Sequence, residues 1–325
     1  MTVTIIRRLM QSVLVVIVMS LIVFVGVSAI GDPTYMFVSP DADQEEIERV
    51  IKTFGFDRPI WERYFLFVKG ALSGDLGNSY VFGQPAMQLI LARMPATLEL
   101  AFSALVLAIV LGIPLGLYAG LRPDGLAAKS IMTGSIVGFS LPTFWVGIML
   151  ILIFAVQLGW LPSTGRGDTV NVLGVDVSFL TLDGLRHLAL PAFNLALLKI
   201  SLVIRLTRAG VREAVHMDYI KFARAKGLSP TRIVGIHLLK NILIPVVTVL
   251  GLEFGSLIAF SVVTETIFAW PGMGKLLIES IQTLDRPVIV AYLMLIVFVF
   301  VVINLVVDLV YAVLDPRVRL AGERG

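Results

Sequence analysis

Long apolar runs alternate with shorter polar segments along the whole chain. A membrane-crossing helix needs ~20 mostly apolar residues to cross the ~30 Å hydrocarbon layer. Six segments approach or exceed that length: Leu9–Ile30, Thr97–Gly120, Ile131–Leu158, Leu188–Ile204, Ile242–Val263 and Val288–Tyr311. Pro191 and Lys199 interrupt the fourth segment. Kinks or breaks are expected at three further prolines, Pro114, Pro142 and Pro245. The pattern predicts an all-α membrane protein with six transmembrane helices.

Composition supports a membrane protein. The chain has 325 residues, of which 57% are hydrophobic and 15% charged, and its mean hydropathy is +0.92. Soluble domains are roughly 45–50% apolar and about 25% charged. The absence of cysteine excludes disulfides, iron–sulfur clusters and thiolate zinc sites. The formal charge of only +3 on so apolar a chain argues against nucleic acid as a partner.

The positive charges predict the orientation of the chain in the membrane. With six spans both termini lie on one side, and that side carries 15 Lys and Arg residues against five acids, while the opposite side carries ten and fifteen. Because cytoplasmic loops are enriched in Lys and Arg, both termini are predicted to be cytoplasmic. A cleaved signal peptide is the alternative for the first span, but its apolar part exceeds the ~7–15 residues of a signal core.

The expected domain organisation has two parts. Residues 1–93 comprise the first span and a sizeable outer loop between spans 1 and 2, from Gly31 to Arg93. Residues 94–325 comprise a core of five spans, with a cytoplasmic loop at 205–240 between spans 4 and 5. The outer loop has an acidic, helix-like stretch at Asp41–Thr53, and it is either a docking surface or a solvated cap.

We find no set of residues for catalysis or metal binding. The nearest approach to a G-x-x-x-x-G-K-[ST] nucleotide loop is Gly274-Lys275, but Ala269 replaces the first glycine and Leu276 follows the lysine. The three histidines form no H-x-x-x-H pair, and no G-x-S-x-G motif occurs. No catalytic residue, metal site or cofactor is therefore assigned to this chain.

A few ionisable residues fall within the predicted spans: Glu99, Lys199, Glu253 and Asp308. A charge near mid-membrane costs ~2.5–3.5 kcal/mol on insertion scales, so each is a functional candidate. Glu99 and Asp308 lie close to the ends of their spans. Lys199 and Glu253 are more central, and they either neutralise one another in a structural role or serve a transport pathway.

The loop at 205–240 is the most distinctive polar segment. It carries eight basic residues against Glu213 and Asp218, and its centre reads DYIKFARAKGLS, Asp218 to Ser229. Helical spacing places Tyr219, Phe222, Ala223 and Lys226 on one face. Gly227 suits a helix C-terminus, and Ser229-Pro230 suits the start of a second short helix. Such a helix either lies in a groove of another protein or rests on anionic lipid.

This segment and the rest of the chain resemble the permeases of ABC importers in the dipeptide/oligopeptide/nickel family. The resemblance begins with DYIKFARAKGLS, followed by His237, Lys240-Asn241 and Pro245. In chain order it includes RRLMQSVLVVIVMSLIVFVGVSAIGDP, RPIWERYFLFVKGALSGDLGNS, MPATLELAFSALVLAIVLGIPLGLYAGLR, GFSLPTFWVGIMLILIFAVQLGWLPSTG, VVTETIFAWPGMGKLL and NLVVDLVYAVLDPRVR. It therefore covers almost the whole chain.

The resemblance implies a division of labour among subunits. Two homologous permeases form the pore in the bacterial inner membrane, two cytoplasmic ATPases that use ATP and Mg²⁺ drive it, and an extracytoplasmic binding protein delivers the substrate. The segment matching Glu213–Thr231 is implied to be the coupling helix, seated in a groove of the ATPase. The implied contact and capping residues are Asp218, Tyr219, Phe222, Ala223, Arg224, Ala225, Lys226 and Gly227.

One residue departs from the wider family pattern. ABC permeases carry E-A-A followed by glycine, whereas Lys221 stands six residues before Gly227 here, which removes one specific Glu contact. Relatives with similar sequences carry peptides, nickel complexes, glutathione-like thiols and some sugars. The alternative function is a self-sufficient secondary transporter or channel that uses Lys199 and Glu253, but such proteins often carry inverted repeats, and none is evident here.

Overall fold

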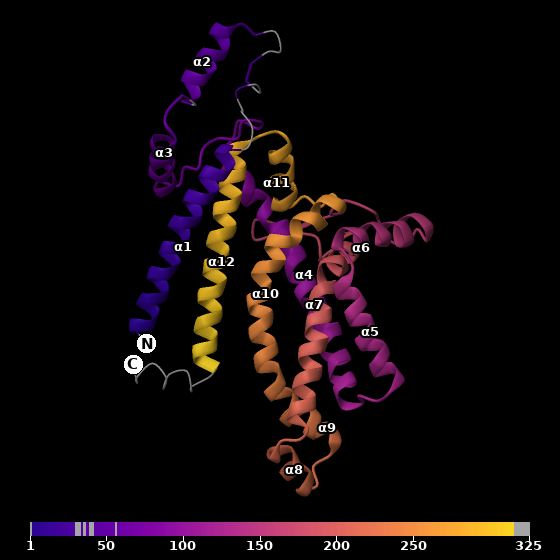
Figure 1. Ribbon diagram of the computed structural model, residues 1–325. Coiled ribbons are helices and arrows are strands. Elements are labelled where there is room, and N and C mark those ends of the chain that lie inside the picture. Colours follow the sequence, from indigo (N-terminus) through magenta and orange to yellow (C-terminus); the bar gives the residue numbers. More distant parts are fainter. Residues whose placement is uncertain (1, 30–33, 35–36, 39–41, 56, 315–325) are drawn as a thin grey trace. The chain divides into compact units, whose positions relative to one another are not determined.

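The computed structural model describes residues 2–29, 34, 37–38, 42–55 and 57–314, and these form two compact units (Figure 1). The first unit comprises residues 1–95 and 272–302, and the second comprises residues 96–271 and 303–325. The predicted basic cluster at Arg317, Arg319 and Arg324 lies outside the described residues, as does the side chain of Asp308.

The first unit contains helices α1 (Thr2–Ala29), α2 (Gln44–Phe54), α3 (Ile60–Leu72) and α11 (Met273–Gln282). It also contains the beginnings of α4 (Ala86–Leu121) and α12 (Arg286–Leu314). The α2 helix has well-formed ends: the Asp43 carboxylate accepts from the Glu46 N–H at 2.8 Å, and Gly55 ends the helix at φ +67°. These are the usual signals of a helix start and stop.

A buried aspartate fixes the loop that precedes α4. The carboxylate of Asp285, between α11 and α12, accepts hydrogen bonds from the Ser79 hydroxyl and, at 3.0 Å, from the Tyr80 N–H. The Ser79 hydroxyl in turn accepts from the Phe82 N–H at 2.9 Å. A buried carboxylate is tolerated only when such donors satisfy it, so this contact holds the loop to the α11–α12 turn.

The second unit is a helical bundle with a short β-hairpin. After α4 come α5 (Leu126–Ser140), α6 (Thr143–Leu150) and the π-helical segment η2 (Ile151–Gln157). The strands β1 (Val170–Val172) and β2 (Val175–Val177) precede α7 (Leu182–Ala214). Then follow α8 (Asp218–Ala225), α9 (Pro230–Arg232), the π-helical segment η3 (Ile233–Leu238) and α10 (Leu239–Ile267). Helix α7 contacts α5, α6 and α10, so it lies at the centre of this bundle.

Five helices within the described residues are long and apolar enough to cross a membrane: Met10–Ala29, Ala86–Leu121, Leu182–Ala214, Pro245–Ile267 and Arg286–Val307. The predicted third span is instead a pair, Leu126–Ser140 and Thr143–Gln157, bent by 107°. The predicted break at Pro142 is confirmed. Leu141 is extended at ψ 135°, as expected before proline, and Pro142 is extended at ψ 130°. Pro191 and Pro245, by contrast, lie inside continuous helices.

Glycines allow α4 and α7 to approach closely. A Cβ added to Gly112 would lie 2.7 Å from the Val203 side chain, and one on Gly116 would lie 2.7 Å from the Ile204 carbonyl oxygen. A Cβ added to Gly120 would lie 2.5 Å from the Val211 side chain. The glycines spaced four residues apart thus form a close helix–helix contact within the bundle, which is a common role of small residues in membrane helices.

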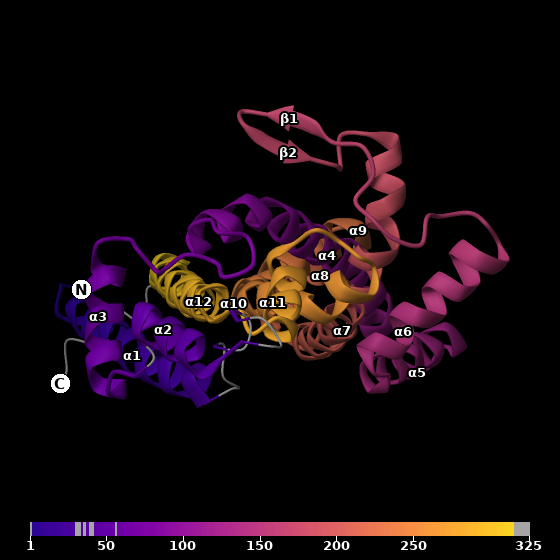
Figure 2. The same cartoon turned by 90° about the horizontal axis from the view of Figure 1, so that it is seen from above.

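A short β-hairpin, which was not predicted from the sequence, precedes α7. Val170 pairs with Val177 and Val172 with Val175 in an antiparallel ladder, and Figure 2 shows the two strands side by side. The turn residues Leu173 and Gly174 have φ of +52° and +86°, the pattern of a two-residue turn with both central φ angles positive. The alternating valines of VNVLGVDV were a local signal for it.

Candidate coupling site and polar clusters

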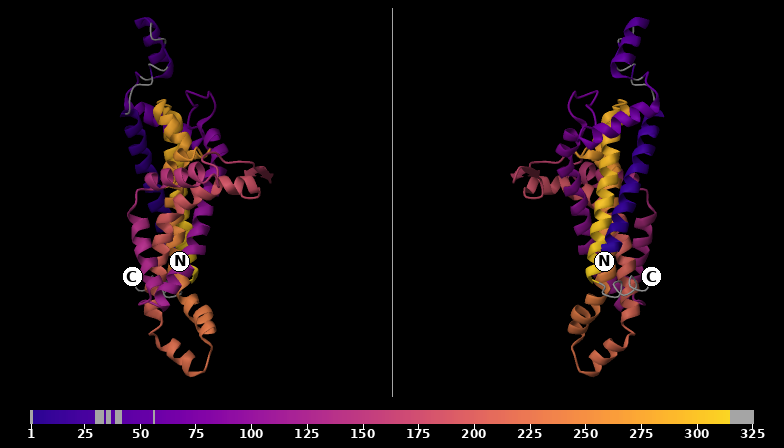
Figure 3. Two further views of the ribbon diagram at one scale, coloured as in Figure 1. Left: turned by 90° about the vertical axis from the view of Figure 1, so that its right-hand side faces the viewer. Right: turned by 90° about the vertical axis from the view of Figure 1, so that its left-hand side faces the viewer.

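The polar loop that follows α7 forms two short helices, which lie beyond the C-terminal end of α7 and the N-terminal end of α10. Figures 1 and 3 show α8 and α9 projecting past that end of the bundle. The α8 helix ends at Ala225, and Gly227 follows in the left-handed region at φ +73°. Pro230 then occupies the first turn of α9. The loop therefore has the two-helix form expected from its glycine and proline positions.

The two sides of α8 differ sharply. Ile220 and Ala223 are buried, and α8 contacts η3. Phe222 is 61% exposed and Tyr219 is 40% exposed. Ala223 therefore lies on the covered side of the helix, and the two aromatic rings lie on its exposed side. An exposed aromatic pair on a short helix is the kind of surface that anchors a protein contact.

Charged side chains surround these rings. The Lys226 ammonium lies 4.6 Å from the centroid of the Phe222 ring, within cation–π range. Lys221 pairs with Asp218 at 2.9 Å, and the hydrogen bond from this lysine lowers the pKa of Asp218 below its usual value. Arg224 and Ala225 are exposed. The accessible surface of α8 is thus aromatic and mostly basic.

The central ion pair considered from the sequence forms in the structure. Lys199 on α7 donates to the Glu253 carboxylate on α10, and also to the Ser256 hydroxyl at 2.8 Å. Ser256 donates to the same carboxylate at 2.7 Å. Only 15% of the Lys199 side chain and 30% of the Glu253 side chain are exposed. Each charge therefore has a partner of opposite sign, which is how intramembrane charges are usually tolerated.

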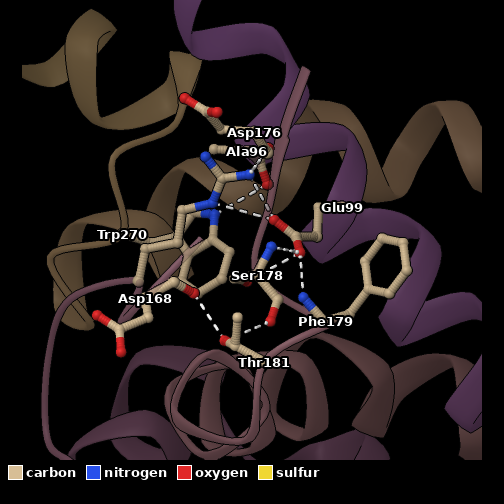
Figure 4. A network of polar contacts seen from close by, with 9 residues as sticks. Ala96, Glu99, Asp168, Asp176, Ser178, Phe179, Thr181 and Trp270 are labelled. Carbon is tan, nitrogen blue, oxygen red and sulfur yellow. Dashed lines mark hydrogen bonds and ion pairs between the residues drawn. The ribbon is translucent and has the colours of Figure 1, made fainter. Parts of the chain in front are cut away.

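Glu99 belongs to a second polar cluster, shown in Figure 4. Its carboxylate accepts from Arg166 at 2.6 and 3.0 Å, from the Ser178 N–H at 2.6 Å and from the Phe179 N–H at 2.9 Å. Arg166 also donates to the Asp176 carbonyl at 2.6 Å. Glu99 was among the ionisable residues expected within the spans, whereas a role for Arg166 was not predicted. The cluster ties the hairpin region to α4.

Two buried residues that follow the predicted fifth span, Glu265 and Trp270, were also not predicted to have a role. Glu265 is fully buried and accepts from the hydroxyls of Thr97 at 2.7 Å and Ser261 at 2.8 Å. Trp270 is fully buried and donates its indole N–H to the Ala96 carbonyl at 2.8 Å. Because the predicted span ended at Val263, Glu265 was not counted among the intramembrane acids, although α10 continues to Ile267.

The candidate spans and the projecting helical loop define a multi-span membrane protein with a polar helical loop at one end of the bundle. Models of two protein families match the chain. Binding-protein-dependent transport system inner membrane component matches residues 112–320, and the N-terminal part of such membrane components matches residues 1–101. The chain therefore belongs to the permease family of binding-protein-dependent ABC transport systems, and it is a multi-pass protein of the bacterial inner membrane.

Characterised relatives cover nearly the whole chain. The di/tripeptide transport system permease protein DppB of Pseudomonas aeruginosa is 38% identical over 89% of this chain and 90% of its own length. The oligopeptide permease AppB of Bacillus subtilis is 38% identical, and the glutathione permease GsiC of Escherichia coli K12 is 36% identical; each match covers 97% of this chain and 98% of the relative.

A solved structure shares the fold. One chain from inward-facing conformations of the MetNI methionine ABC transporter aligns with a TM-score of 0.51 at 18% identity, covering 70% of this chain and 97% of that one. The expected membership of the ABC importer permeases is thus confirmed by the family models and relatives together.

Proposed function

We propose that this permease forms half of a translocation pathway for peptides or closely related small solutes. The support is the common chemistry of the cargoes named for its relatives. Di- and tripeptides, oligopeptides and glutathione all carry amide bonds between amino-acid units. The proposed cargo is delivered by an extracytoplasmic solute-binding protein, and the pathway is completed by a second homologous permease subunit.

In this proposal α8 is the coupling helix, and the observation that carries it is the aromatic side of that helix. Tyr219 and Phe222 are exposed at the end of the bundle, where burial within this chain does not account for them. Buried Ile220 and Ala223 hold the helix against η3, so a push on its outer surface is transmitted to α10. Arg224 and Lys226 flank the contact, and Gly227 ends the helix.

The energy source lies in other subunits in this proposal. Two cytoplasmic ATPases bind ATP and Mg²⁺ and receive the two coupling helices of the paired permeases. ATP binding closes the ATPase dimer and moves these helices, so that the membrane bundles reorient and cargo passes inward. No cofactor is assigned to this chain, because its nearest glycine–lysine sequence, Gly274-Lys275, departs from a phosphate-binding loop at two positions.

The proposed topology has six spans, with α5, α6 and η2 together serving as one bent span. Both termini and the 205–240 loop are cytoplasmic in this proposal, because that side gathers the excess of Lys and Arg. Residues 1–93 form the first span and outer loop, and residues 94–325 form the permease core. The ion pair of Lys199 and Glu253 is assigned a structural role, since the two charges neutralise one another.

A photo-crosslinking experiment tests the coupling assignment. Phe222 is replaced by benzoylphenylalanine, which preserves an aromatic side chain at an exposed position. The matched control places the same probe at exposed Phe65 in α3, in the predicted outer loop. We expect light to join the Phe222 variant, but not the control, to the ATPase subunit. An adduct with lipid alone at position 222 would support the lipid-resting alternative and overturn the assignment.

A further inference from the structure

Helix α3 presents an apolar side that stays exposed in the part of the chain that the structure describes. Trp61 is 73% exposed, Phe65 is 68% exposed and Leu72 is 86% exposed. Their spacings of four and seven residues place all three on one side of the helix. Three large apolar side chains with this exposure form a patch rather than scattered surface residues, and such patches mark contacts with a partner or a membrane.

An adjacent side of α3 packs against the membrane helix α1. The Phe24 ring lies 5.5 Å from the Tyr64 ring and 5.3 Å from the Phe67 ring, measured between centroids. The hydroxyls of Ser20 and Tyr64 are hydrogen-bonded at 2.8 Å. Both α1 residues lie inside the candidate span Met10–Ala29, so α3 is attached to the span itself.

The position of this contact along α1 gives the depth of α3. At ~1.5 Å per residue, Phe24 lies about 8 Å and Ser20 about 14 Å from the end of the span at Ala29. The hydrocarbon layer is ~30 Å thick, so these residues lie within its outer half. The neighbouring α1 residues Leu21 and Val25 are exposed and apolar. The apolar side of α3 therefore continues the surface that α1 offers to lipid.

Charged residues border this patch. Glu62 and Arg63 lie further round the helix, and exposed Lys69 lies at the edge of the patch, four residues after Phe65, where its long side chain can extend to water. Arg58, just before the helix, pairs with Glu62 at 3.3 Å where both side chains are about half exposed. A helix with aromatic and aliphatic residues on one side and charges on the other is the form that lies in a membrane interface.

We propose that α3 is an interfacial anchor, which lies at the surface of the bilayer near the Ala29 end of α1. Trp61, Phe65 and Leu72 enter the boundary between headgroups and acyl chains, while Glu62 and Lys69 face water. The occupant of the apolar side is lipid rather than a docked protein, because the helix is fastened to α1 at a depth that lies within the apolar layer. Tryptophan is favoured at this level of the membrane.

Site-directed spin labelling tests this proposal, since the chain has no native cysteine. Nitroxide labels are attached singly in Phe65→Cys and Leu72→Cys, and in the same-helix control Glu62→Cys, with the full-length chain in lipid vesicles. Leu14→Cys on exposed α1 supplies the lipid reference, and Glu48→Cys on exposed α2 supplies the water reference. Collision rates with oxygen, which concentrates in lipid, and with a water-soluble nickel chelate are then compared.

We expect the labels at 65 and 72 to have oxygen-to-nickel collision ratios near that of position 14, and the label at 62 a ratio near that of position 48. Equal nickel access at positions 65, 72 and 48 would overturn the proposal. Labels at 65 and 72 that are water-exposed in vesicles and become shielded only when the solute-binding protein is added would also overturn it, in favour of protein docking. Because all three α3 positions are exposed, these variants leave the packing on α1 intact.

Discussion

At the scale of single residues, the key distinction in α8 is between neighbouring side chains with opposite surroundings. Ala223 is buried against the rest of the loop, whereas the adjacent Phe222 points outward. A sequence pattern that placed both on one helical face did not separate these roles. The structure does, because the contact of α8 with η3 determines which side is covered. Substitutions on the exposed side are therefore expected to affect binding rather than folding.

We predict that Phe222→Ala weakens association with the ATPase by about 2 kcal/mol or more, roughly 30-fold in affinity, as expected for an aromatic anchor. The thermal stability of the Phe222→Ala permease should change little, because the ring that is removed is mostly exposed. The measurement is titration of detergent-solubilised permease with purified ATPase. Lys221→Ala is the control on the same helix, since its pair with Asp218 is fully exposed and screened by solvent, and so contributes little. Equal affinity of the two variants would contradict the prediction.

The pair of Lys199 and Glu253 gives a second residue-scale prediction. Glu253→Gln leaves the Lys199 charge without its main partner, and we expect a loss of about 3 kcal/mol in stability. The double variant Lys199→Met, Glu253→Gln should recover most of that loss and still import cargo. Thermal unfolding in detergent and uptake in vesicles are the two measurements. A double variant that is stable but does not transport would show that the charges serve the pathway.

At the scale of elements, the bundle depends on close approach between helices. Gly116→Ala would place a Cβ 2.7 Å from both the Ile204 carbonyl oxygen and the Thr207 side chain, and we expect overpacking of roughly 1–3 kcal/mol. Gly134→Ala is the matched control, since no described atom lies within 4 Å of its added Cβ. Thermal unfolding should show a lower midpoint for the first variant alone. Equal midpoints would mean that α4 and α7 are not in close contact.

The hairpin region gives a prediction at the same scale. Glu99→Ala removes the acceptor for the backbone N–H groups of Ser178 and Phe179. Hydrogen bonds to charged groups contribute ~1.5–3 kcal/mol, so hydrogen exchange at these two amides should accelerate roughly tenfold or more. Asp176→Ala is the control, because that carboxylate bonds only Asn171 among the described contacts. Unchanged exchange in Glu99→Ala would show that the hairpin is held by other contacts.

The sequence predicted these elements unevenly, for physical reasons. Hydropathy located the spans because length and apolarity alone decide whether a helix can cross a bilayer. It did not predict that the third span bends by 107°, since proline predicts a break but tertiary packing determines the angle. Arg166 and Glu265 were overlooked because their importance lies in partners far away in the chain, at Glu99 and Thr97. The short hairpin had a local signal, but its few residues were absorbed into an outer loop.

At the scale of the whole molecule, the family to which the chain belongs implies one subunit of a larger transport complex. Its relatives match it over nearly their full length, so the division of labour proposed from the family concerns the matched length and not one segment of it. The exposed aromatic side of α8 and the lack of a recognisable phosphate-binding loop lead to the same expectation. We therefore expect this subunit to provide a route across the membrane and other subunits to provide the energy and the cargo.

Uptake of a labelled dipeptide into lipid vesicles tests this central claim most directly. Vesicles are prepared with the permease chain alone, and with the permease pair, the ATPases and the solute-binding protein together. We predict uptake only from the complete set, only with ATP and Mg²⁺ on the ATPase side, and abolished when the binding protein is omitted. Uptake by this chain alone, without ATPase subunits, would contradict the account and support a self-sufficient transporter.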